Sequence, residues 1–266
     1  MKLGIGSYTY TWACGVPGSM PARRMTAMDL CRRAEALGVK VVQLCENITF
    51  EYAKLDTLRD SARRAGIEIE TGGRGLTSRG FMDALDMACQ FETGFFRLVV
   101  DSDGDEPSPA ETVRRLKALL QFVPKRIRIA LENHDRFPAR TLVGIMEEAG
   151  SDRIGITLDT VNSFGALEGP QHVVETLAPY VLSLHVKDFT IRRVPSQMGF
   201  VIEGCPAGEG RLDIPWLLDC IRGSGRDPNA IIELWTPPAD TLEETIVREA
   251  EWAKRSVAYM RTLLPD

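Results

Sequence analysis

Short apolar runs of strand length alternate with amphipathic, charge-bearing segments along the whole chain, and this alternation restricts the fold more than any other feature. The runs are nearly continuous in Val, Ile and Leu, which is typical of strands buried on both faces of a parallel sheet. Eight such runs lie at residues 3–8, 39–45, 66–71, 95–101, 126–132, 153–159, 180–186 and 230–235. The segments between them predict helices at residues 27–37, 55–65, 109–122, 141–149, 170–178, 214–222 and 242–264.

The number and order of these units predict a single α/β domain, a (β/α)8 TIM barrel that spans residues 1–266. No Pro/Ser-rich linker or change of composition marks a domain boundary. An open doubly wound sheet is the competing interpretation, but it requires a glycine fingerprint after the first strand. Gly4 and Gly6 lie inside that strand, and the glycine-rich stretch at residues 71–75 is interpreted as a turn.

Composition excludes several classes of protein. The 266 residues are 44% apolar and 26% charged, which is ordinary for a globular chain, and the net charge of −5 disfavours a nucleic-acid partner. No run approaches the roughly 18 apolar residues of a membrane span, and the first ten residues do not resemble a secretory signal. The six cysteines contain no C-x-x-C pair. We therefore expect a cytoplasmic protein with reduced thiols, no membrane association and no zinc-thiolate site.

Four of the predicted strands end in side chains that bind hard metal ions. They are Glu132, Asp159, His185 and Glu233, and active sites of TIM barrels lie at the carboxyl ends of the strands. Taken singly, each glutamate fits a salt bridge, Asp159 fits a helix cap and His185 fits a hydrogen-bonded core position. Their joint occurrence on four strands predicts a divalent-metal site, with Mn²⁺ first and Mg²⁺, Co²⁺ or Zn²⁺ as alternatives.

Three neighbours of these residues are candidates for substrate binding. His134 follows Glu132 closely and binds substrate or orients a carboxylate. Asn162 suits a substrate hydroxyl or a loop turn, and Lys187 suits an enolate oxygen or an ordinary salt bridge. The long connection at about residues 188–210 predicts a small hairpin that acts as a lid. We also expect Tyr8, Trp12 and Phe200 to form an apolar wall against a sugar ring.

The ordered motifs of the chain resemble those of the sugar phosphate isomerase/epimerase group within the xylose isomerase-like barrels. These motifs are L-E-N at 131–133, L-D-T-x-N at 158–162, H-V-K-D at 185–188, G-E-G-x-x-D at 208–213 and I-E-L at 232–234. The group includes ketose 3-epimerases, hydroxypyruvate isomerase and inosose dehydratase. The resemblance implies that Glu132, Asp159, His185 and Glu233 bind the metal, that Glu132 and Glu233 exchange the proton beside the carbonyl, and that the protein is a homodimer.

The resemblance implies a metal-dependent sugar isomerase or epimerase that acts on a ketose or keto-polyol through an enediolate. Asn162 stands where the ketose epimerases have a histidine, so a lyase or dehydratase acting on a keto-sugar or inosose is the alternative. A sugar-binding barrel without catalysis is a third interpretation. An endonuclease for abasic DNA, to which the group is distantly related, is disfavoured because the chain has only 3 histidines and a negative net charge.

Overall fold

The computed structural model describes residues 1–196 and 198–265. Eight strands close into a barrel in the order β1-β10-β7-β6-β5-β4-β3-β2, which confirms the predicted TIM barrel. Neighbouring strands pair in parallel, for example β5 with β6 and β1 with β10. The strands are β1 (Leu3–Gly6), β2 (Val41–Leu44), β3 (Glu68–Arg74), β4 (Phe95–Val99), β5 (Arg128–Glu132), β6 (Ile154–Asp159), β7 (Val181–Val186) and β10 (Asn229–Ile232).

In the described part of the chain, a helix of at least eight residues follows each barrel strand. These helices are α2 (Ala27–Leu37), α3 (Leu55–Arg64), α4 (Ser78–Gln90), α5 (Pro109–Leu120), α6 (Ala139–Ala149), α7 (Pro170–Leu177), α8 (Ile214–Gly223) and α9 (Leu242–Leu263). The short helix α1 (Thr11–Cys14) precedes α2 in the first connection. Local signals set the bounds of α2, where Thr26 and Asp29 form a capping box and Gly38 ends the helix in the left-handed conformation.

The predicted turn at residues 71–75 is wrong, because β3 continues through this stretch to Arg74. The glycines there serve close packing, since a Cβ atom at Gly73 would lie 2.6 Å from Cβ of Ala84 in α4. Only Gly75, just after the strand, has a positive φ, at 93°. The glycine content of this stretch therefore indicates a turn that the structure does not contain, and the helix that follows, α4, was not predicted.

The chain divides into two compact units. The first contains residues 1–68, 185–217 and 229–266, and α1 and α9 pack together within it. The second contains residues 69–184 and 218–228, and in its core Phe81 of α4 meets Phe96 of β4 edge to face at 5.5 Å. The prediction of a single domain stays a prediction.

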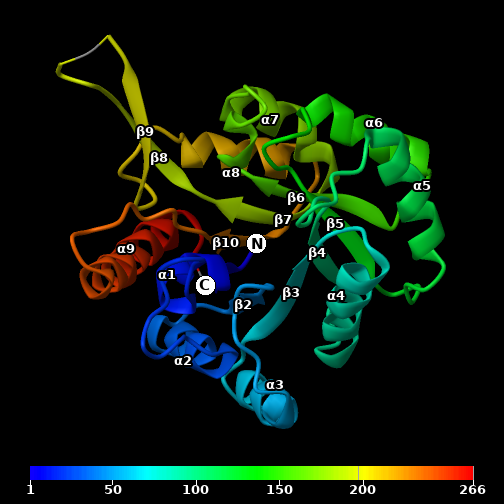
Figure 1. Ribbon diagram of the computed structural model, residues 1–266, viewed down its shortest axis with the longest axis horizontal. Helices are drawn as coiled ribbons and strands as arrows, with labels where there is room; N and C mark the ends of the chain where they lie inside the picture. The colour runs from blue at the N-terminus through cyan, green and yellow to red at the C-terminus, as the bar shows by residue number, and fades with distance from the viewer. Residues whose placement is uncertain (197, 266) are drawn as a thin grey trace. The chain divides into compact units, whose positions relative to one another are not determined.

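A hairpin lies within the connection between β7 and α8. Its strands β8 (Asp188–Arg193) and β9 (Phe200–Cys205) pair antiparallel, with Ile191 opposite Ile202. Figure 1 shows β8 and β9 in yellow, side by side. Residue 197 in the turn between them lies outside the described residues, and the role of the hairpin as a lid stays a prediction.

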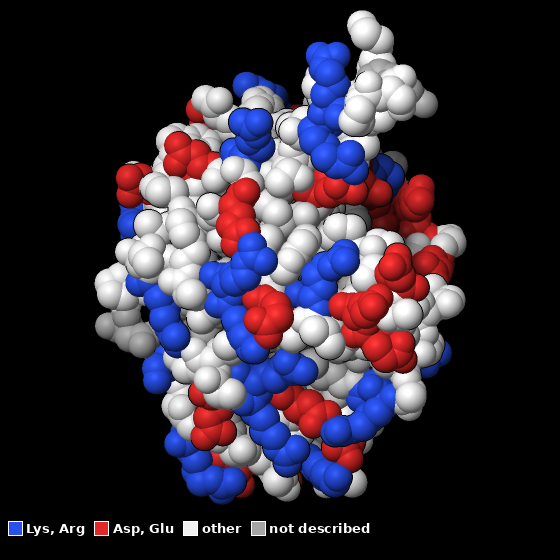
Figure 2. All heavy atoms as spheres, turned by 90° about the vertical axis from the view of Figure 1, so that its left-hand side faces the viewer, with Lys and Arg blue, Asp and Glu red and all other residues white. Residues whose placement is uncertain are grey.

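No helix in the described part of the chain combines the length and the hydropathy that crossing a bilayer requires. On the face shown in Figure 2, Lys and Arg side chains lie interspersed with Asp and Glu side chains.

Candidate metal centre

Glu132 and Asp159 are the last residues of the adjacent strands β5 and β6, and both are buried. The amide side chain of Asn133 continues the pairing of these strands beyond their ends. Its Nδ2 donates to the backbone oxygen of Asp159 at 2.8 Å, and its Oδ1 accepts from the backbone N–H of Asp159 at 2.7 Å. Asn133 thus fixes the carboxyl ends of the two strands relative to each other, which explains the asparagine of the L-E-N motif.

A buried arginine lies beside Glu132. The guanidinium of Arg97, on β4, forms an ion pair with Oε2 of Glu132, and both side chains are almost completely buried. Asn162 donates from Nδ2 to Oε1 of the same carboxylate at 3.0 Å. Arg97 was not predicted, although a single arginine inside the apolar run F-F-R-L-V-V indicates a buried charge that needs a partner.

Asp159 also caps the turn that follows β6. Its Oδ1 accepts from the backbone N–H groups of Val161 and Asn162, each at 2.8 Å. The predicted helix cap is wrong, because the helices that follow β6 have Val161 and Gly169 at their N-caps. Asn162 contacts both Asp159 and Glu132. These contacts leave both predictions for Asn162, loop turn and substrate contact, open.

His185 lies on β7 and Glu233 directly follows β10. Nδ1 of His185 is 3.1 Å from Oε1 of Glu233, and its Nε2 is 2.8 Å from Oε1 of Gln43 on β2. An amide oxygen only accepts hydrogen bonds, so the contact with Gln43 suits a protonated Nε2 and would leave Nδ1, on the side of Glu233, as the nitrogen that can bind a metal ion. Lys187 places Nζ 2.9 Å from Oε2 of Glu233, so the predicted salt bridge of Lys187 is present. Gln43 was not predicted.

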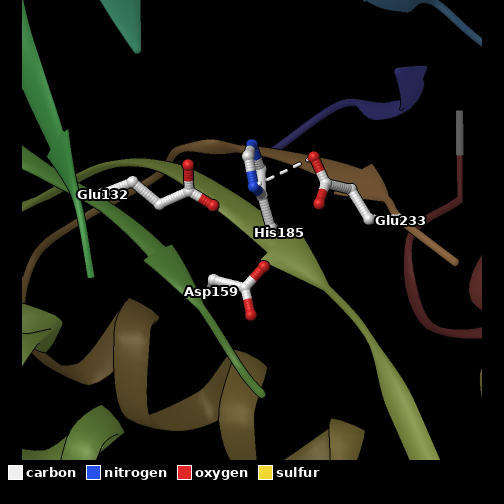
Figure 3. A group of neighbouring side chains, drawn as sticks. All are labelled: Glu132, Asp159, His185 and Glu233. Carbon is white, nitrogen blue, oxygen red and sulfur yellow. Dashed lines mark ion pairs between the residues drawn. The ribbon is translucent and has the colours of Figure 1, made fainter. Parts of the chain in front are cut away.

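One potential ligand atom from each of Glu132, Asp159, His185 and Glu233 lies within 4.8 Å of those of the others, and all four residues are buried. Figure 3 shows the three carboxylates around the imidazole. Three buried carboxylates at this separation repel one another, and a divalent cation would offset that repulsion. Three oxygen donors and one nitrogen donor fit such a cation, and they do not by themselves fix its identity.

His134 does not belong to this group. It lies beyond the end of β5 with its side chain 31% exposed, and its Nδ1 is 2.6 Å from Oδ1 of Asp135. The hydrogen bond from His134 lowers the pKa of Asp135. A role for His134 in substrate binding stays a prediction.

A cavity of about 480 Å³ opens beside Lys187. Its aromatic lining comes from Tyr8, Trp12 and Trp235, so two of the three predicted wall residues are present. Phe200 lies outside this lining, where it is 63% exposed and its ring is 4.9 Å from the guanidinium carbon of Arg193. The remaining lining residues are Thr11, Val16, Lys187, Ile202, Glu203, Gly204, Leu234, Thr236 and Pro237.

Asp188 organises the loop that follows the hairpin. Its carboxylate accepts four backbone N–H groups, from Phe189 at 2.8 Å, Gly208 at 2.9 Å, Gly210 at 3.0 Å and Leu212 at 3.0 Å. Gly210 must be a glycine, since a Cβ atom there would lie 2.1 Å from Oδ1 of Asp188. The H-V-K-D and G-E-G-x-x-D motifs thus form one structural unit.

Comparison of the sequence with known proteins identifies related chains. The sequence pattern of the xylose isomerase-like TIM barrel family matches residues 31–263. The chain is 32% identical over 269 residues to 3-oxo-isoapionate decarboxylase of Pectobacterium atrosepticum, covering 100% of this chain and 97% of the relative.

Solved structures share the fold at lower identity. D-psicose 3-epimerase of Clostridium cellulolyticum H10, solved with D-tagatose, has a TM-score of 0.73 at 14% identity and 99% coverage of both chains. A xylose isomerase-like TIM barrel protein of Mycobacterium smegmatis, solved in complex with magnesium, has a TM-score of 0.68 at 13% identity and 97% coverage of both chains.

Proposed function

Because the chain belongs to the xylose isomerase-like TIM barrel family, we propose that it is a divalent-metal-dependent lyase that decarboxylates a small 3-oxo sugar acid. The activity named for the relative from Pectobacterium atrosepticum supports this substrate class over a ketose. Glu132, Asp159, His185 and Glu233 would hold the metal, for which we propose Mn²⁺. When bound there, the cation would act as a Lewis acid toward a substrate carbonyl oxygen. We further propose a small-molecule substrate and no nucleic-acid partner.

The ion pair between Arg97 and Glu132 is the observation that carries the choice of reaction. An isomerase needs a carboxylate that removes a proton from carbon, and a buried guanidinium stabilises the ionised carboxylate and so weakens it as a base. Decarboxylation needs no such base, because the bond that breaks joins two carbons. The environment of Glu132 therefore supports a metal ligand that does not abstract a proton.

The reaction requires two things of the protein. When the bond between the carboxyl carbon and the α-carbon breaks, CO₂ leaves and the electron pair moves to the neighbouring carbonyl oxygen as an enolate. The enolate then takes one proton at the α-carbon, which restores a ketone. Positive charge near the oxygen and an acid near the carbon would favour both steps.

In this proposal Lys187 supplies the positive charge near the oxygen, and solvent supplies the proton that the α-carbon takes up. The ammonium group of Lys187 lines the cavity, and Glu233, 2.9 Å from Nζ, stabilises the protonated form. Its side chain is only 13% exposed, so water screens its charge little. The aromatic lining from Tyr8, Trp12 and Trp235 would bury the carbon skeleton of a compact substrate.

The isomerase or epimerase predicted from the sequence is the second candidate. Glu132 and Glu233, the two carboxylates that such an enzyme would use for proton exchange, are both present and buried. Like decarboxylation, isomerisation passes through an enolate, so the two reactions differ in which bond breaks first.

Incubation of the Mn²⁺-loaded protein with 3-oxo-isoapionate in D₂O tests the proposal. We expect release of CO₂, one deuterium at the α-carbon of the product, and loss of both after treatment with a chelator. Lys187→Met should lower CO₂ release by at least about hundredfold, while Lys254→Met on the exposed side of α9 should leave it unchanged. Deuterium exchange into a panel of ketoses, with no CO₂ from the 3-oxo acid, would instead favour the isomerase.

A further inference from the structure

We propose that Glu249 is a positioning residue that holds Trp12 in the aromatic lining of the cavity, an inference that rests on the proposed function for its effect on catalysis. Glu249 lies on α9, is 0% exposed and has no part in the steps described above. Its Oε1 accepts from the backbone N–H of Trp12 at 3.0 Å, and its Oε2 accepts from the backbone N–H of Ala13 at 3.2 Å. One buried carboxylate thus holds the first turn of α1.

The side chain of Trp12 is held independently. Its Nε1 donates to the backbone oxygen of Thr236 at 2.8 Å, and both residues line the cavity beside Lys187. Glu249 therefore fixes the backbone of Trp12 while Thr236 fixes its indole ring. With both attachments in place, the ring has one position against the substrate space, and the loss of either would let the lining move.

The surroundings of Glu249 explain why a carboxylate stands there. From α2, Arg33 approaches with its guanidinium carbon 4.8 Å from the ring centroid of Tyr10, and it favours the ionised form of Glu249. Cys14 of α1 and the phenol of Tyr10 also interact electrostatically with Glu249, and burial raises the pKa of each to about 12, so both are neutral near pH 7. Burial also raises the pKa of Glu249 itself to about 7.

The charge on Glu249 consequently changes near neutral pH. The ionised carboxylate offers two acceptors to two N–H groups, whereas the protonated acid or an amide would place a donor against one of them. Attachment of α1 should therefore tighten as the pH rises through about 7.

Hydrogen exchange tests the attachment without any substrate. At alkaline pH we expect Glu249→Gln to lower the protection of the amides of residues 11–14 by at least about tenfold. Glu251→Gln, which alters an exposed carboxylate on the same helix, should leave that protection unchanged. Glu249→Asp, which keeps the charge on a shorter side chain, should restore part of the protection and serves as the informative variant if Glu249→Gln does not fold. Equal protection in the wild type, Glu249→Gln and Glu249→Asp would overturn the proposal.

Steady-state kinetics with the 3-oxo acid test the consequence for catalysis. In Glu249→Gln we expect KM to rise roughly tenfold with kcat nearly unchanged, and the rise of kcat/KM through about pH 7 to disappear. A lower kcat with an unchanged KM would overturn the positioning role. If the wild type does not turn over the 3-oxo acid, the proposed function fails, and the exchange experiment still decides whether Glu249 positions Trp12.

Discussion

Each of the four predicted metal ligands has a protein partner that fixes its orientation. Arg97 pairs with Glu132, and backbone N–H groups hold Asp159. Gln43 holds His185, and Lys187 pairs with Glu233. Such outer contacts orient ligands and adjust their basicity, so single changes at the ligands and at their partners should have different effects.

Replacing Glu132 with Gln tests the proposed centre most directly. An amide keeps the shape of the carboxylate but removes its negative charge, so we expect weaker Mn²⁺ binding and a loss of CO₂ release of at least about hundredfold. Titration calorimetry and a CO₂ assay measure the two effects. Glu148→Gln, on the exposed side of α6, is the matched control. Unchanged turnover in Glu132→Gln would reject the role assigned to this residue.

Replacing Gln43 with Leu should weaken Mn²⁺ binding by about 10- to 100-fold, because the proton on Nε2 of His185 loses its acceptor and the ring loses its fixed orientation. Gln43→Glu keeps an acceptor at the same place and should retain more of the affinity. Calorimetry compares the three proteins. Equal affinity in the wild type and Gln43→Leu would show that the imidazole does not depend on this contact.

The sequence was sufficient to predict that Glu132, Asp159, His185 and Glu233 lie together, and among their partners it indicated Lys187 but neither Arg97 nor Gln43. Glu132, Asp159, His185 and Glu233 stand at strand ends, and the closure of a barrel brings strand ends together. Arg97 and Gln43 lie inside apolar runs. The contact of Arg97 depends on the register in which β4 pairs with β5, and the contact of Gln43 joins β2 to β7, which are not neighbours in the barrel. A single sequence contains neither the register nor the contacts across the barrel, so the unusual place of Arg97 inside an apolar run does not identify its partner.

At the scale of whole elements, hydrophobic patterning predicted all eight barrel strands and most helices, because buried parallel strands read as continuous apolar runs. The bounds of α2 were predicted correctly because residues next to its ends determine them: Thr26 caps its start and Gly38 ends it. The failures are at β3 and α4, where Gly73 serves helix packing. A glycine that permits close approach looks the same in a sequence as a glycine that forms a turn.

The hairpin offers a test at this scale. Gly204 of β9 lies against the indole of Trp235, and a Cβ atom there would be 1.5 Å from Cδ1 of that ring. We expect Gly204→Ala to displace the ring or the base of the hairpin, and so to lower the melting temperature and change the tryptophan fluorescence. Gly199→Ala, where nothing lies within 4 Å of the added carbon, is the control. Equal melting temperatures and equal fluorescence spectra of the two variants would mean that the added carbon at residue 204 does not displace Trp235.

For the whole molecule, the titration of Glu249 predicts how stability depends on pH. The carboxyl group ionises at about 4.5 in the unfolded chain, while burial raises its pKa to about 7 in the folded protein. Between these values the unfolded state binds fewer protons, so this group lowers the free energy of unfolding by about 3 kcal/mol as the pH rises.

Urea denaturation of the wild type and Glu249→Gln at several pH values measures this contribution. The difference between the two curves should change with pH in the interval from about 4.5 to 7 and level off above it. A constant difference throughout that interval would contradict the raised pKa of Glu249.

The loop gathered around Asp188 has a consequence for engineering. The carboxylate of Asp188 accepts hydrogen bonds from backbone N–H groups at the start of the hairpin and after its end. Residues 188–212 therefore form one segment whose two ends are held by the same side chain. Exchange of this segment between relatives should succeed when Asp188, Gly208 and Gly210 are transferred together. A crossover point inside this segment would combine Asp188 of one relative with the 208–212 loop of another, and the carboxylate would then lose hydrogen bonds from that loop.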